Sequence, residues 1–320
     1  MTRPHHAGGG SPAPAPEPRS WLGVHVFYDG DLDAVAGDLL GDITARLAAE
    51  EAAEGLFFLR HWEAGPHVRI RVLPGPRRTG DARRIVTGAA EAFLARRPAP
   101  SLVGQAEYER YAPAFAAAEE AAGYERRRRP NNSLAEIPYR PETGKYGTGA
   151  ALHAVEDHFV RCSAVVREVI SADPQGGRRA ATAFALLALA WWTAPSSGDA
   201  PSAPVSPPRG VPEPAAAPAD LYHRRRDALL DTLARTRDLA AAARGRPAGT
   251  LGMWAWSVAA AVDGLRDPAR ARRVLDQCAH LACNRLGLDA SRELTLRRLL
   301  HLAAADHLSA GRSGGPASAT

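Results

Sequence analysis

The sequence has few cysteines, no long apolar run and no apolar N-terminal segment. Its three cysteines, Cys162, Cys278 and Cys283, are too few for a disulfide framework, and an odd count is typical of a reducing compartment. The most apolar run, residues 181–192, is shorter than the roughly 20 residues that a membrane span requires. The first 20 residues lack the apolar core of a signal peptide. We therefore expect a cytoplasmic protein with no membrane partner.

Lysine is nearly absent, and arginine carries almost all of the positive charge. Lys145 is the single lysine among 40 basic residues, so 40 − 1 = 39 are arginines. A net charge of +5 is compatible with an anionic partner but is weak evidence for one. The arginine runs at 126–129 and 224–226 have no interleaved aromatic residues. We therefore expect no direct contact with nucleic acid.

Composition divides the chain into a sheet-containing part and a helical part. Residues 1–20 and 311–320 are rich in small residues and are expected to be disordered tails. Residues 21–147 are expected to form an α+β layer, and residues 148–310 a helical part. A flexible loop rich in Pro, Ser and Ala is expected at 194–217.

Hydrophobic periodicity predicts the order β-α-β-β-α in the first part. Residues 21–28, 55–62 and 67–73 are aromatic or β-branched and are predicted to be strands. Residues 136–141 could supply a further strand, and six helices are predicted from residue 149 onward. The predicted fold class is therefore α+β, with a ferredoxin-like N-terminal layer and a mainly helical C-terminal half.

The third predicted strand carries basic side chains on one face. His67, Arg69 and Arg71 alternate with apolar residues, so alternate side chains lie about 7 Å apart on the same face. A four-residue turn brings Arg60 near them. Such a face could grip a carboxylate or a phosphate through guanidinium forks. A solvated outer face with acidic partners would show the same alternation, and composition alone favours that simpler interpretation.

A loop punctuated by proline and glycine holds a second group of candidates. Residues 136–149 contain Glu142, Lys145 and Tyr146. A rigid loop could place this acid, base and phenol beside a substrate, with glycines allowing close approach. An ordinary turn before the next helix is the simpler interpretation.

A predicted helix holds the third group. His280 and Asn284 share a helical face because they are four residues apart. A lone helix histidine is usually structural unless other polar groups converge on it. Cys278, Cys283 and His280 lack the spacing of zinc ligands, so no metal is expected. No phosphate- or dinucleotide-binding glycine loop occurs, and no cofactor is expected.

Three segments in this order resemble a known family. They read FFLRHWEAGPHVRIRV, YRPETGKYGTGAALHAVEDHF and HLACNRLG. The sequence resembles the C-terminal elimination domain of class I lantibiotic dehydratases, also called the thiopeptide-type bacteriocin biosynthesis domain. The resemblance extends from about Trp21 to His307. Because the chain contains no glutamylation domain, we expect a free-standing member.

The resemblance implies an enzyme that modifies ribosomally made antibiotic peptides. Its substrate would be a modified precursor peptide recognised partly through a leader segment. As a lyase, it would eliminate glutamate from glutamylated Ser or Thr and leave dehydroamino acids; a separate glutamyl-tRNA-dependent partner would attach that glutamate. Free-standing relatives instead join two dehydroalanines in a [4+2] cycloaddition, which forms a pyridine and closes a thiopeptide macrocycle. A non-catalytic module that binds the leader is a third alternative.

The resemblance also implies roles for individual residues. Arg69 and Arg71 would hold the glutamyl carboxylates, and His280 would give a proton to the departing glutamate. Lys145 replaces the family's arginine, and near Arg69 and Arg71 it would lose its proton more easily and could act as the base. These four residues are the predicted catalytic set. The predicted substrate-binding residues are Arg60, His67, Glu142, Tyr146, Asn284 and Arg285.

The retained arginine pair favours elimination, whereas the lysine replacement and the free-standing length keep cycloaddition open. If the assignment is right, Arg69 and Arg71 should point into a cleft that His280 also faces.

Overall fold

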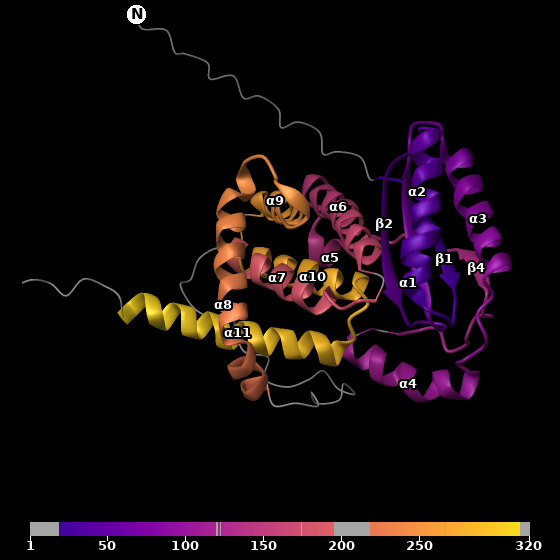
Figure 1. The fold of residues 1–320 in the computed structure, drawn as a ribbon. Helices are drawn as coiled ribbons and strands as arrows, with labels where there is room; N and C mark the ends of the chain where they lie inside the picture. The colour runs from indigo at the N-terminus through magenta and orange to yellow at the C-terminus, as the bar shows by residue number, and fades with distance from the viewer. Residues whose placement is uncertain are drawn as a thin grey trace, which may run out of the picture.

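Two groups of secondary structure lie side by side in the computed structural model (Figure 1). The first contains a small sheet with its helices, and the second is helical. The described residues are 19–119, 121, 123–173, 175–194, 218–265 and 267–313. Three expected segments therefore lie mostly outside the described residues. They are the N-terminal tail at 1–20, the loop at 194–217 and the C-terminal tail at 311–320. Within the described ranges, no helix is long and apolar enough to cross a bilayer.

The sheet has four strands in the order β2-β3-β1-β4, and each neighbouring pair is antiparallel. The strands are β1 (Leu22–Phe27), β2 (Ala53–His61), β3 (His67–Pro74) and β4 (Ser133–Glu136). The predicted hairpin is confirmed, since His61 pairs with His67 across the turn between β2 and β3. A mixed fold with a helical second half is also confirmed, whereas the ferredoxin-like description of the layer stays a prediction.

The fourth strand is not where the sequence predicted it. The prediction covered residues 136–141, but β4 ends at Glu136. Pro138 and Pro141 follow, and proline cannot donate a backbone hydrogen bond to a neighbouring strand. Only Ile137 continues the pairing, through its N–H to the Gly23 carbonyl at 3.0 Å. The strand therefore ends where the prolines begin.

One face of the sheet packs against helices. After β1 the chain forms α1 (Leu32–Ala34), a π-helical turn (Val35–Leu39) and α2 (Leu40–Ala49), and α3 (Thr79–Arg96) follows β3. The apolar residues of the alternating strands turn toward these helices; Val68 and Ile70 are fully buried. A further helix, α4 (Gln105–Ala118), was not predicted, because Pro113 interrupts its pattern. It lies beside the β2–β3 turn, where the Ala64 N–H donates to the Tyr108 hydroxyl at 2.9 Å.

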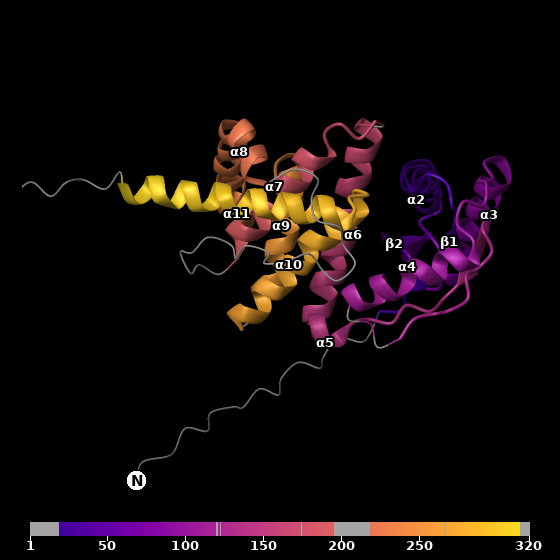
Figure 2. The same cartoon turned by 90° about the horizontal axis from the view of Figure 1, so that it is seen from below.

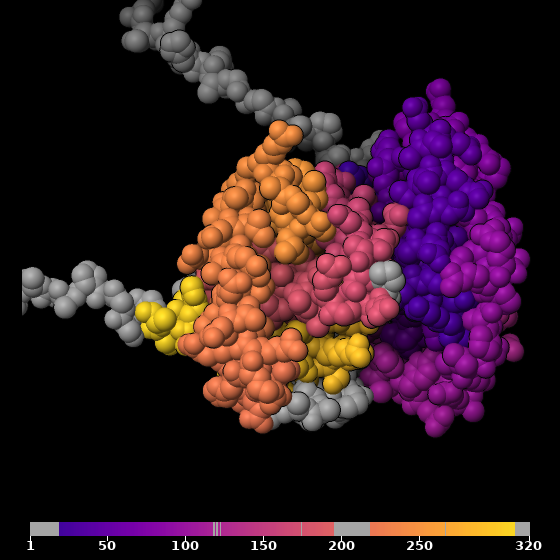
Figure 3. Space-filling view, in the orientation of Figure 1, coloured from indigo at the N-terminus to yellow at the C-terminus, as the bar shows by residue number. Residues whose placement is uncertain are grey.

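All six helices predicted in the second part form. After the short α5 (Thr143–Tyr146), they are α6 (Ala150–Ala172), α7 (Arg179–Thr193), α8 (Pro218–Ala241), α9 (Gly249–Asp263), α10 (Pro268–Arg285) and α11 (Ala290–Ser313). A 3₁₀ turn, Ala242–Arg244, follows α8. Helices α6 and α10 contact strand β2, so the helical part packs against the edge of the sheet (Figure 2). In the space-filling view, the two parts lie directly against each other (Figure 3).

Candidate active site

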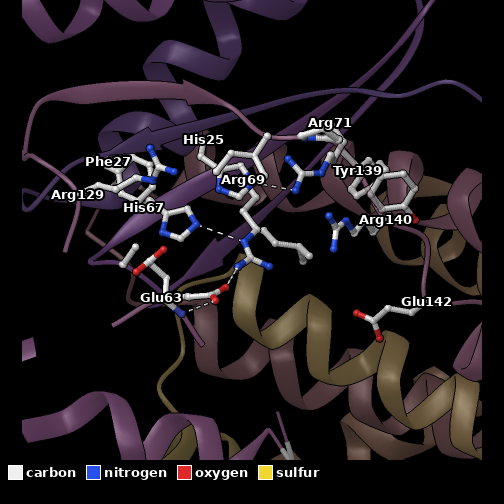
Figure 4. A pocket seen from close by; sticks show the side chains of 16 residues that line it. His25, Phe27, Glu63, His67, Arg69, Arg71, Arg129, Tyr139, Arg140 and Glu142 are labelled. Carbon is white, nitrogen blue, oxygen red and sulfur yellow. Dashed lines mark hydrogen bonds and ion pairs between the residues drawn. The ribbon is translucent and has the colours of Figure 1, made fainter. Parts of the chain in front are cut away.

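The uncovered face of the sheet forms the wall of a cavity of about 400 Å³. Strand β3 turns His67, Arg69 and Arg71 into this cavity, so the shared face predicted for them is confirmed (Figure 4). The other walls come from β1, β2, the β2–β3 turn and the segments before and after β4. The lining residues are His25, Phe27, Phe57, Leu59, Glu63, Ala64, His67, Arg69, Arg71, Glu125, Arg129, Ile137, Pro138, Tyr139, Arg140 and Glu142.

Arg69 has an acidic partner within the cavity. Its Nη2 lies 2.8 Å from Glu63 Oε2, and its Nε donates to His67 Nε2 at 3.2 Å. Burial lowers the pKa of Arg69, and the charge of Glu63 opposes that effect. The charge of Arg69 is therefore largely balanced before any ligand enters.

Arg71 is buried and, among the described residues, no carboxylate pairs with it. Its side chain donates to His25 Nε2 at 2.8 Å and to the Ile70 carbonyl at 3.2 Å. Its guanidinium lies 5.8 Å from the centre of the Tyr139 ring. Burial, and next the charge of Arg69, lower the pKa of Arg71 to about 10, so it stays charged at neutral pH. A buried charge without a counter-ion is costly, which makes this position suited to an anionic ligand.

The cavity histidines are neutral and support the arginines. His67 donates from Nδ1 to the Gly65 carbonyl at 2.9 Å, which leaves Nε2 as the acceptor for Arg69. His25 stacks on His67 with 4.8 Å between ring centres and accepts from Arg71. Burial is the main cause of the lowered pKa of both rings. His67 therefore lines the cavity as predicted, but both of its nitrogens are already engaged.

The loop candidates separate in the structure. Glu142 lines the cavity, whereas Lys145 and Tyr146 do not. Lys145 Nζ lies 2.5 Å from Glu142 Oε2, and both side chains are more than half exposed. Tyr146 is buried against Phe159, with 5.4 Å between ring centres. Lys145 thus lies beside a carboxylate, and the like-charged surroundings that motivated its role as a base are not those of the structure.

His280 is not among the residues that line this cavity, and the cleft that it was expected to share with Arg69 and Arg71 stays a prediction. Its Nδ1 lies 2.8 Å from Glu293 Oε2 on helix α11. It sits one helical turn, roughly 6 Å along the axis, from Asn284, which touches strand β2. The sequence predicted the shared helical face but could not predict the Glu293 contact.

Asn284 and Arg60 join the two parts of the molecule. The Asn284 carboxamide accepts from the Arg60 N–H and donates to the Arg60 carbonyl, both at 3.0 Å. The carboxamide thereby pairs with the backbone N–H and carbonyl of Arg60 at the edge of β2, as a neighbouring strand would. Arg60 also lies 2.5 Å from Asp33 and donates to the Arg285 carbonyl at 3.0 Å. Neither residue lines the cavity, and substrate binding by them stays a prediction.

Arg285 is fully buried at the same joint. Its Nε donates to the Phe58 carbonyl at 2.8 Å, and its guanidinium lies 5.2 Å from the centre of the Phe159 ring. The left-handed Gly287 follows, with φ of 78°, and a Cβ there would lie 3.0 Å from the Arg60 guanidinium. Arg285 could reach a substrate only after a rearrangement of this joint.

Sequence analysis missed several cavity residues. His25 lies on β1 with its side chain on the same face as the arginines, and alternation along the first strand could have identified it. Tyr139 lies in the loop motif between two prolines, where no periodic signal exists. Burial is the main cause of its raised pKa, and the Glu156 charge adds to it, so the phenol keeps its proton. Glu63 belongs to the β2–β3 turn, where it was assigned no role.

Within the described residues, no group of three or more His, Cys, Asp or Glu side chains is arranged to hold a metal ion. The cavity is lined by four arginines, three glutamates, neutral imidazoles, a phenol and aromatic walls. Such a lining can bind a carboxylate or a polarised carbonyl oxygen and can hold a peptide segment against apolar surface.

Three solved structures share this fold at low sequence identity. The pyridine synthase TbtD from thiomuracin biosynthesis has a TM-score of 0.70 and 20% identity, over 91% of this chain and 99% of that chain. TsrL has a TM-score of 0.59 and 14% identity, over 94% and 100%. MibB, a tRNA-dependent lantibiotic dehydratase from Microbispora sp. 107891, has a TM-score of 0.54 and 19% identity; the match covers 98% of this chain but 29% of MibB.

No curated protein matches the chain. Residues 21–304 match the family model described as the C-terminal part of lantibiotic biosynthesis dehydratases. This match includes every cavity residue and spans most of the chain, in agreement with the resemblance seen in the three sequence motifs. The chain therefore belongs to the lantibiotic biosynthesis dehydratase C-terminal family.

Proposed function

We propose that the chain is an enzyme of antibiotic-peptide biosynthesis that eliminates glutamate from glutamylated Ser or Thr residues of a precursor peptide. The substrate enters the cavity on the open face of the sheet, and a leader segment contributes to its recognition. A separate protein attaches the glutamate, using glutamyl-tRNA. The family membership and the chemistry of the cavity support this proposal.

The buried Arg71 carries the proposal. It is a cation on the wall of a cavity, and no carboxylate of a described residue balances it. A glutamyl carboxylate would supply the missing negative charge and would form forked hydrogen bonds with the guanidinium. Arg69 already forms an ion pair with Glu63, so Arg71 is the better candidate for the first contact with the substrate.

The reaction needs a base for the Cα proton of the glutamylated residue. The electron pair of that C–H bond becomes the Cα=Cβ bond, the Cβ–O bond breaks, and glutamate leaves as its carboxylate. Glu142 is the first candidate for this base, because it reaches the cavity from the loop. Its ion-pair partner Lys145 is the alternative candidate. Guanidinium groups stabilise the negative charge that develops as the proton leaves.

A second candidate function is the joining of two dehydroalanines into a pyridine. It needs a pocket that folds the peptide and an acid–base pair, but no glutamate clamp. The apolar walls formed by Phe27, Phe57 and Leu59 could hold the reacting segments.

Two substrates distinguish these functions. With a glutamylated precursor, we expect release of free glutamate and a peptide that keeps its leader, both detected by mass spectrometry. A pyridine synthase would leave that substrate unchanged, and would consume a peptide with two dehydroalanines while expelling the leader. If neither substrate reacts but the leader binds, the chain is a binding module and the proposed elimination is wrong.

A further inference from the structure

The end of helix α10 and the start of α11 bring His280 against an acidic side chain. Gly287 adopts a left-handed conformation just after α10, and the chain turns into α11 within a few residues. His280 Nδ1 then lies 2.8 Å from Glu293 Oε2. A carboxylate oxygen only accepts a hydrogen bond, so Nδ1 carries the hydrogen. The other ring nitrogen, Nε2, makes no hydrogen bond to any described residue.

Glu293 is fixed on its other side as well. Its Oε1 accepts from Arg297 Nε at 2.8 Å, and Arg297 also pairs with Asp276 of α10. The side chain of Glu293 is 9% exposed, whereas that of His280 is 46% exposed. A carboxylate held at both oxygens therefore orients an imidazole whose side chain is partly exposed.

The charges around His280 favour its protonated form. Burial lowers the pKa of His280, but the hydrogen bond and charge of Glu293 outweigh burial and raise it overall. Arg297 opposes this effect and Asp276 adds to it. The pKa of Glu293 is lowered, since its contacts with His280 and Arg297 outweigh burial. This contact thus favours the protonated imidazole and the ionised carboxylate.

The position of the pair relates it to the cavity. Asn284, one turn after His280, hydrogen bonds to the backbone of Arg60. Leu59, the neighbour of Arg60 in β2, lines the cavity. The turn of α10 next to His280 is therefore held against the strand that forms this side of the cavity. His280 Nε2 makes no hydrogen bond within the described part of the chain.

We propose that Glu293 is a positioning residue that fixes the tautomer and orientation of His280, so that Nε2 can give a proton to the carboxylate oxygen of the departing glutamate. This inference rests on the proposed elimination and adds a residue to it. His280 acts on the substrate, and Glu293 acts only through His280. Arg297 holds Glu293 in place.

The test is Glu293→Gln, which keeps the shape and the acceptor oxygen but removes the charge. Histidine NMR titration of the free protein measures His280 directly, with His280→Gln identifying its signal. We expect the pKa of His280 to fall in Glu293→Gln and to be partly retained in Glu293→Asp. Glu168→Gln, on an exposed face of α6, is the matched control and should leave the titration unchanged.

Glutamate release against pH gives the second measurement. An acid must be protonated, so the rate should fall as pH rises through the His280 pKa, and Glu293→Gln should shift this fall to lower pH. The loss above that pH should reach up to about 10²-fold and should be recovered at lower pH. A titration that does not move, or a rate profile that stays fixed while the titration moves, overturns the proposal. If the unmutated protein releases no glutamate at any pH, the proposed function fails, and the NMR titration still decides whether Glu293 controls His280.

Discussion

Arg71 and Arg285 are both buried arginines beside an aromatic ring, but they occupy different kinds of space. Arg285 is enclosed at the joint between sheet and helices, where it donates to a backbone carbonyl of β2. Arg71 opens onto a cavity and bonds to a neutral histidine. Neither has a carboxylate partner among the described residues. The comparison teaches that access, more than burial or charge, separates a binding arginine from a structural one.

The largest expected effect is on Arg71. Arg71→Gln should lower glutamate release on the order of 10²–10³-fold, because the substrate carboxylate loses its cation. The midpoint of thermal unfolding should stay or rise, since an unpaired buried charge is removed. Glutamate release by Arg71→Lys should lie between that of the unmutated protein and that of Arg71→Gln, because lysine keeps the charge but not the paired N–H donors of the guanidinium. Arg83→Gln, at an exposed ion pair, is the control. Full activity of Arg71→Gln would remove the cavity from the mechanism.

A substitution at the joint between the sheet and the helices should change stability and not activity. Gly287→Ala forces a side chain into a left-handed backbone with φ of 78° and against the Arg60 guanidinium. We expect a loss of about 1–2 kcal/mol in the free energy of unfolding, measured by urea denaturation, with unchanged kcat.

Gly88→Ala is the matched control for this change. Gly88 lies on an exposed part of helix α3, and no described atom lies within 4 Å of the added Cβ. It should stabilise the protein by up to about 1 kcal/mol. Equal effects of the two substitutions would show that the joint is not tightly packed.

The smallest effect is expected at Lys145. Its ion pair with Glu142 is more than half exposed, and such pairs contribute about 1 kcal/mol or less. Lys145→Arg preserves the pair, so activity and stability should change little. A loss of 10²-fold or more in glutamate release would instead identify Lys145 as the base, because arginine does not give up its proton in proteins.

Local patterns predicted much of this architecture. Period-two alternation identified the β2–β3 hairpin and the cavity face of β3, and helical periodicity identified six helices of the second part. Prediction failed where proline interrupts a pattern, at α4 and at the end of the last strand. It also failed for Tyr139, since a loop between two prolines has no periodicity to interpret.

The sequence by itself determined the family, most of the strands and helices, and the placement of Arg69 and Arg71 on one face, because these depend on neighbours within a few residues. Only the tertiary structure decided which charges remain unbalanced. Glu63 reaches Arg69, Glu293 reaches His280, and Asn284 fastens β2 across 224 positions of sequence. Folding brings distant segments together, and this decides whether an arginine lies beside a carboxylate, a backbone carbonyl or an open cavity. These surroundings decide in turn whether its charge is available to bind a ligand.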